Sequence, residues 1–171
     1  IGSDVDVTGV STDTRAVADG QLFIALSGDR FDAHDFLDQA VAAGATALLV
    51  SNESKVPAGV SAVVVDDTRL ALGRFAAAWR AQFDLPVIAV TGSNGKTTTK
   101  EMIASILKAA FGAAVLSTRG NLNNDIGLPL TLLGLRASHR AAVIVLCFSR
   151  PRDLPSLWPP GPPPGAFVLA A

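Results

Sequence analysis

The sequence predicts an α/β fold built from strand-helix-strand units. Short apolar runs rich in valine, isoleucine and leucine alternate along the chain with longer segments whose apolar residues recur at helical spacing. With 49% hydrophobic residues among 171, the chain is long enough to bury the core of one ordinary domain or of two small ones. Its formal net charge of -1 favours small molecules or proteins over nucleic acid as partners.

The expected elements follow from this pattern. Six apolar runs are predicted to be strands: residues 21–26, 46–50, 62–65, 87–91, 114–117 and 142–146. An apolar face over residues 35–43 predicts a helix that stops at Gly44, since glycine commonly terminates helices. A second helix is expected from Asp67 or Thr68, either of which can cap it, to about residue 83, with Leu70 among its apolar positions.

A domain boundary is expected just before Pro86, because proline ends helical geometry ahead of a new strand. Residues 1–84 then form a small α/β domain, and residues 85–146 form the front part of a second one. We interpret residues 147–171 as an aberrant proline-rich tail. Seven of the chain's ten prolines lie in the final 21 residues, and this composition cannot hydrogen-bond as helix or central strand.

A phosphate-binding loop is expected where a strand, a glycine turn and a helix follow one another. Its residues are Gly92, Ser93, Asn94, Gly95, Lys96, Thr97 and Thr98. The glycines let the backbone approach an anion, Lys96 can reach the phosphates as the catalytic residue, and Thr97 offers a hydroxyl to Mg²⁺. Ile103 and Ile106 belong to the expected apolar face of the helix. The strict spacing would need a glycine at Val90, so an ordinary helix start preceded by glycine is the competing interpretation.

Other signals are fewer. Cys147 is the single cysteine, which excludes an internal disulfide framework and fits a reducing compartment. No apolar stretch approaches the roughly 18 to 20 residues that span a bilayer, and the first residues lack the regions of a signal peptide. We therefore expect a cytoplasmic monomer without membrane contact. His34 is expected to be a partly buried histidine bonded to backbone, rather than a catalytic or metal-binding one.

Three stretches carry a resemblance to a known family. Residues 91–101, TGSNGKTTTKE, are similar to the ATP loop of the Mur ligases, which build the peptide of bacterial cell-wall precursors. Residues 120–133, GNLNNDIGLPLTLL, resemble the segment of those members that join D-alanyl-D-alanine to UDP-N-acetylmuramoyl-tripeptide. Residues 10–36 are similar to the family's UDP-sugar-binding domain. The resemblance implies a small N-terminal α/β UDP-sugar-binding domain followed by an incomplete P-loop α/β domain.

The resemblance also implies substrates and site residues. It implies ATP and Mg²⁺ as cofactors, with ATP phosphorylating the tripeptide carboxylate before the amine of D-alanyl-D-alanine attacks the acyl phosphate. The implied substrate-binding residues are Thr12, Asp13, Arg15, Asn121 and Asn124. An arginine can grip a diphosphate by paired hydrogen bonds. Turns stabilised by local backbone bonds explain the threonine, the aspartate and the asparagines without any ligand.

The resemblance extends from about residue 5 to about Ile144 and then fails. At the next position the family has a glutamate that helps to hold Mg²⁺, whereas Val145 offers no oxygen to a hard cation. Because the resemblance ends inside a strand, we interpret the remainder as a frameshift and expect a truncated, inactive form of an ATP-dependent amide ligase. The alternatives are a non-catalytic nucleotide or nucleotide-sugar binder, another Mur-type ligase, or a chain that does not fold stably past residue 140.

Overall fold

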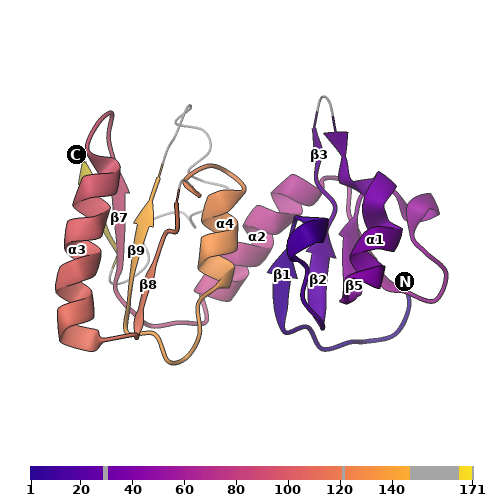
Figure 1. Cartoon of the computed structure of the whole chain (residues 1–171), viewed down its shortest axis with the longest axis horizontal. Helices are drawn as coiled ribbons and strands as arrows, with labels where there is room; N and C mark the ends of the chain where they lie inside the picture. Colours follow the sequence, from indigo (N-terminus) through magenta and orange to yellow (C-terminus); the bar gives the residue numbers. More distant parts are fainter. Residues whose placement is uncertain (29–30, 121, 147–165, 171) are drawn as a thin grey trace. The chain divides into compact units, whose positions relative to one another are not determined.

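The computed structural model describes residues 1–28, 31–120, 122–146 and 166–170 (Figure 1). The chain forms two compact units, Ile1–Leu72 and Gly73–Ala171, which we describe in turn. Helix α2, Thr68–Arg80, begins in the first unit and ends in the second. The division therefore falls inside a helix, whereas the expected domain boundary near Pro86 lies after it, and that boundary stays a prediction.

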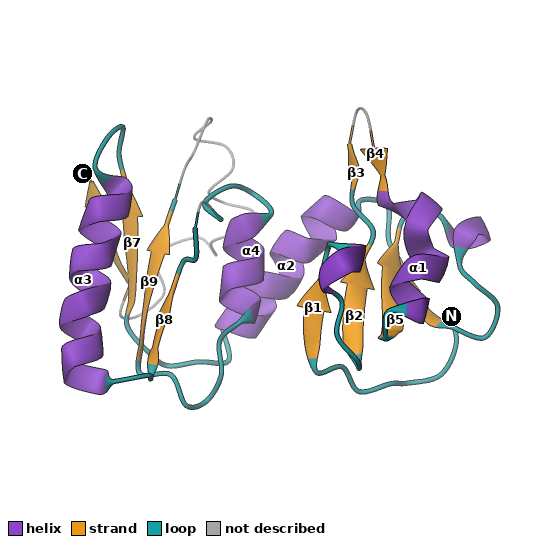
Figure 2. Ribbon diagram, viewed as in Figure 1, coloured by secondary structure: helices purple, strands orange, loops and turns teal. Residues whose placement is uncertain are grey.

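The first unit contains a parallel sheet of four strands in the order β1-β2-β5-β6 (Figure 2). These strands are β1 Gly9–Ser11, β2 Gln21–Ile24, β5 Ala45–Val50 and β6 Ser61–Val64. A short antiparallel hairpin joins β3, Ser27–Gly28, to β4, Phe31–Asp32. Helix α1, Leu37–Ala42, packs against β5, and its buried Leu37 joins Phe23, Leu48 and Val50 in one apolar core. Single turns of 3-10 helix occupy Thr14–Ala16, Ala33–Phe36 and Glu53–Lys55.

The second unit contains another parallel sheet, in the order β10-β7-β9-β8 (Figures 1 and 2). Its elements in chain order are β7 Val87–Thr91, α3 Lys96–Phe111, β8 Val115–Ser117, α4 Gly127–Leu133, β9 Ala141–Val145 and β10 Ala166–Ala170. Helix α3 covers a face of this sheet, where Ala104 packs against Val90 and Val143. Since β7 runs directly into the turn before α3, the carboxyl edge of the sheet carries the glycine loop, which is the usual ligand edge of parallel sheets.

The structure confirms the α/β class and all six predicted strands, with ends that differ by at most two residues. Strands β1, β3 and β4 and helix α4 were not predicted. Strand β10 was not predicted: it lies in the last residues of the segment interpreted as a proline-rich tail, after the last proline and at the edge of the sheet, where it does not conflict with the exclusion of helix and central strand; residues 147–165 and 171 lie outside the described residues. Its Val168 and Leu169 are exposed.

Two predicted apolar positions were also wrong. Leu70 on α2 is 49% exposed and Ile106 on α3 is 68% exposed. On α3 the face that meets the sheet is the row of Lys100, Ala104 and the partly buried Leu107, at helical spacing. Ile106 therefore lies on a different side of the helix, although its chemistry fits a core.

Candidate functional site

The glycine turn between β7 and α3 has the backbone geometry of an anion cradle. Gly92 and Gly95 have φ values of 132° and 78°, and Gly95 is the left-handed N-cap of α3. A side chain at Gly95 would meet no atom within 4 Å, so glycine is needed there for its conformation rather than for space. The N–H of Thr99 makes an early helical bond, to Gly95 O at 2.9 Å. The amides just before it lack an intrahelical partner and are suited to a negative charge.

Lys96 lies over this turn. Its Nζ donates to Gly92 O at 2.6 Å and lies 3.4 Å from Ser93 O, so the ammonium stays at the loop rather than extending into solvent. A phosphate bound at the loop would replace these carbonyls as its partner. Ser93 and Asn94 are exposed in the turn.

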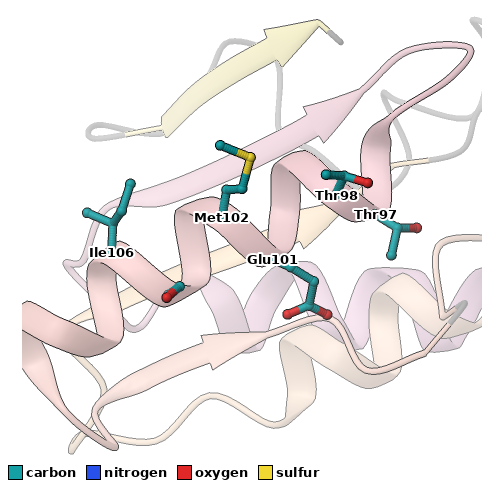
Figure 3. Close-up of a pocket in the computed structure, with 6 residues that line it drawn as sticks. Thr97, Thr98, Glu101, Met102 and Ile106 are labelled. Atoms are coloured by element: carbon teal, nitrogen blue, oxygen red, sulfur yellow. The ribbon is translucent and has the colours of Figure 1, made fainter.

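The first turns of α3 border an open depression of about 610 Å³ (Figure 3). Figure 3 shows the lining side chains in two rows along the helix, one with Thr98, Met102 and Ile106 and the other with Thr97 and Glu101. Residues four apart share a helix side, which produces these rows. The glycine turn does not line this depression. The depression therefore lies along the side of α3 and is separate from the anion cradle.

The described residues do not supply a metal site by themselves. Among them, no group of three or more His, Cys, Asp or Glu side chains could hold a metal ion. At the carboxyl edge Thr97 offers one exposed hydroxyl, and Val145, at the end of β9 and 4% exposed, offers none. Mg²⁺ prefers one or two carboxylates together with phosphates and water. This donor set does not fit an ion held by the protein, and fits at most one that arrives with a nucleotide.

A cluster that sequence reasoning missed lies beside the loop. Lys100 is 3% exposed, and its Nζ donates to Thr118 O at 3.0 Å and to Glu101 Oε1 at 2.5 Å. The lysine ammonium lowers the pKa of the Glu101 carboxyl. The sequence could have indicated a role for Lys100 through its position alone, since it lies one turn after Lys96 and at helical spacing from Ala104.

Two asparagines were predicted to bind substrate. Asn121 lies outside the described residues. The Oδ1 of Asn124 accepts from the N–H of Gly127 at 2.8 Å and from that of Ile126 at 3.3 Å, so this oxygen caps the turn that leads into α4. Gly127 packs closely rather than turning, because a Cβ there would lie 2.5 Å from the Cα of Leu122.

The predicted nucleotide-sugar residues of the first unit form a compact turn. Asp13 caps the 3-10 turn Thr14–Ala16 by accepting from the N–H of Arg15 at 3.0 Å. It also receives the Arg15 guanidinium in a fork, at 3.0 and 2.7 Å. The side-chain bonds from Arg15, followed by its backbone bond, lower the pKa of Asp13 to about 2. The arginine side chain is 87% exposed, so it can reach a ligand if it gives up or shares its aspartate. Thr12 is half-buried next to this turn.

His34 has the structural role expected of it, although it is fully rather than partly buried. It is 3% exposed, and its Nε2 accepts from the N–H of Ser51 at 2.9 Å. Nε2 is therefore unprotonated, and the Nδ1 proton is directed at Asp32 Oδ1, 2.6 Å away. Asp32 also receives Lys55 at 3.1 Å, so this network links the β3-β4 hairpin to the residue that follows β5.

Fold and loop together define the class of protein. A parallel sheet whose strand runs through a glycine turn into a helix, with a lysine at the helix start, is a phosphate-loop α/β protein. Two family models then identify it further: the Mur ligase family, catalytic domain, matches residues 6–80, and the Mur ligase middle domain matches residues 90–149. The chain belongs to the Mur ligase family and carries N-terminal and middle-domain sequence.

Several relatives resemble the chain in detail. UDP-N-acetylmuramoyl-tripeptide--D-alanyl-D-alanine ligase of Haemophilus influenzae is 53% identical over 145 residues, covering 84% of this chain and 32% of that protein. The same ligase of Escherichia coli is 52% identical, covering 85% and 31%. The chain therefore spans about a third of the length of these relatives.

Solved structures agree with the sequence comparison. MurF from Acinetobacter baumannii has 50% identity and a TM-score of 0.74, covering 82% of this chain and 30% of that one. MurF ligase from Thermotoga maritima, solved in complex with ADP, has 34% identity and a TM-score of 0.74, covering 87% and 34%. Within the described residues, no helix is both long and apolar enough to cross a membrane.

Proposed function

We propose that this chain is the front portion of an ATP-dependent amide ligase that joins D-alanyl-D-alanine to UDP-N-acetylmuramoyl-tripeptide in peptidoglycan precursor synthesis. The main observation in support is the left-handed glycine turn at the start of α3, with Lys96 lying over it. Relatives with about half of their aligned residues identical bear the name of this ligase, and one similar structure was solved with ADP.

The roles we propose follow from the geometry. The loop residues Gly92 to Thr98 hold the phosphates of ATP through backbone N–H groups, and Lys96 stabilises the charge that develops when a phosphoryl group moves to the tripeptide carboxylate. The turn of Thr12, Asp13 and Arg15 binds the UDP-sugar, with the exposed guanidinium on its diphosphate. Mg²⁺, when bound with the nucleotide and touching Thr97, would offset phosphate charge. We further propose that this chain alone binds nucleotide without completing the ligation.

The test is ATP binding by titration calorimetry on the whole chain, with Lys96→Met as the variant. Losing a charge-assisted hydrogen bond to phosphate weakens affinity by roughly ten- to a hundredfold. Lys108→Met, an exposed lysine in the last turn of the same helix, is the matched control and should bind as the wild type does. Failure of the wild type to bind ATP at millimolar concentration, or equal affinity in Lys96→Met, would contradict the proposal.

A second candidate, a non-catalytic binder of nucleotide or nucleotide-sugar, is favoured by Val145. The end of β9 offers no carboxylate to a metal, so the loop can keep its affinity while the chemistry lacks a metal ligand. Phosphate release assayed with ATP, the tripeptide precursor and D-alanyl-D-alanine separates the two. Release that needs all three substrates identifies the ligase, and binding without release identifies the binder.

A further inference from the structure

Lys100 carries a charge into the interior beside the phosphate loop. The residue is 3% exposed, and its Nζ has two partners among the described residues, the carbonyl oxygen of Thr118 and the carboxylate of Glu101. Removing an ammonium from water is costly unless hydrogen bonds replace the lost hydration. These two bonds therefore fix where the charge lies.

Thr118 connects that charge to the sheet. It is 1% exposed and directly follows β8. Its N–H donates to Val143 O at 3.0 Å, and its hydroxyl accepts from the N–H of Val145 at 3.0 Å. One residue thus holds the last part of β9 from its backbone and from its side chain, while its carbonyl receives Lys100.

The hydrogen bond between Lys100 and Thr118 matters because of where Thr118 lies in the chain. Thr118 opens the segment of residues 118–126, which leads into α4 and includes Asn124; residue 121 of this segment lies outside the described residues. Helix α3, which bears Lys100, starts at the phosphate loop one turn earlier, at Lys96. The Lys100–Thr118 bond is therefore a direct polar link between the phosphate-loop helix and the start of the segment that follows β8.

We propose that Lys100 is a positioning residue that holds the beginning of segment 118–126 at a fixed place relative to the phosphate loop. The functional part of this inference rests on the proposed function, in which that loop holds ATP, and on the prediction that Asn124 of that segment binds substrate. Lys100 touches neither ligand in this role. It acts through the carbonyl of Thr118.

Hydrogen exchange read by mass spectrometry on the whole chain, without ligand, tests the proposal. Lys100→Met keeps the apolar stem and removes the ammonium, so the hydrogen-bonded amides of Thr118, Leu122 and Gly127 should exchange about tenfold faster or more. Lys100→Arg retains donors and charge and should recover much of the protection. Lys108→Met and Glu101→Gln are the controls: the first changes an exposed lysine, and the second leaves the bond to Thr118 in place.

Two further readouts separate positioning from general stability. The ATP affinity of Lys100→Met should stay within about threefold of the wild type, since Lys96 and the loop amides are unaltered and a full charged bond would cost tenfold or more. In wild-type protein labelled with ¹⁵N-lysine, the Nζ protons of Lys100 should exchange slowly, because two acceptors and burial protect them.

The outcomes that overturn the proposal are specific. Unchanged exchange over residues 118–127 in Lys100→Met would do so, as would an equal rise through all of α3 and β9, which would make Lys100 a general stabiliser. If the Lys100→Met variant does not fold, the wild-type protein still tests the proposal. Exchange of its Lys100 Nζ protons as fast as in solvent would then overturn it. Failure of the wild type to bind ATP would instead contradict the proposed function and leave the exchange comparison intact.

Discussion

Asn124 allows capping to be separated from ligand binding, because two substitutions affect the two roles differently. Its Oδ1 accepts from the partly buried N–H of Gly127 at 2.8 Å, at the entrance to the almost wholly buried α4. Asn124→Ala removes the acceptor and should lower the free energy of unfolding by about 1 kcal/mol, the typical net contribution of an intramolecular hydrogen bond. Asn124→Asp keeps an oxygen there and adds a negative charge at a helix start, which is worth about 0.3–1 kcal/mol in favour.

The substrate side of the prediction has the opposite order. Aspartate lacks the Nδ2 donors and adds a charge that repels an anionic precursor, so Asn124→Asp should bind UDP-N-acetylmuramoyl-tripeptide more weakly than Asn124→Ala does. Urea unfolding followed by circular dichroism gives the stabilities, and titration calorimetry gives the affinities. Equal destabilisation by both substitutions would refute the cap, and wild-type affinity in Asn124→Asp would remove Asn124 from the substrate site.

Two other predictions concern acid and metal. The pKa of Asp32 is lowered, first by the backbone N–H of His34 and then by the His34 side chain, Lys55 and Ser27. The ionised Asp32 therefore stabilises the fold above the unfolded-state pKa of about 3.9, and this stabilisation is lost as the pH falls from there towards the lower pKa of the folded state. Asp32→Asn should therefore flatten the acid limb of unfolding, whereas Asp6→Asn, an exposed control, should not; parallel limbs would count against the network. Val145→Glu should make ATP affinity depend more strongly on Mg²⁺ than in the wild type, measured by calorimetry with and without EDTA, while Val145→Gln should not. A Glu variant with the wild type's response to EDTA would exclude position 145 as a metal ligand.

The elements that were predicted well from the sequence are those whose local composition indicates that they are buried. Parallel strands buried on both faces read as continuous apolar runs, and β7 and β9 are of this kind. Strand β1 has only three residues, Gly-Val-Ser, and takes its conformation from pairing with β2. Helix α4 contains Pro129 in its first turn and begins with a glycine, both weak helix formers, and forms because nearly all of its side chains are buried.

The same distinction applies to the site. The phosphate loop is contiguous, so its glycines and lysine could be predicted from the strand, turn and helix around them even though the strict motif spacing is not met. The Lys100–Thr118–Val145 link depends on which side of α3 faces the sheet and on the register of β8 with β9, which no local pattern encodes. The partial burial of Ile103, in contrast to the exposure of Ile106, has the same origin. The frameshift interpretation concerns the residues after about Ile144 and stays a prediction.

The pairing of β7 on both sides, with β9 and with β10, bears on the energetics of the loop it leads into. A strand bonded along both edges opens rarely, since local opening must break two ladders at once. The glycine turn is thus anchored at one end by that strand and at the other by α3. The entropic cost of ordering the glycine turn arises when the chain folds, not when a ligand binds. An anion that binds there would meet amides that are already aligned, so less of its interaction energy would be offset by ordering the loop.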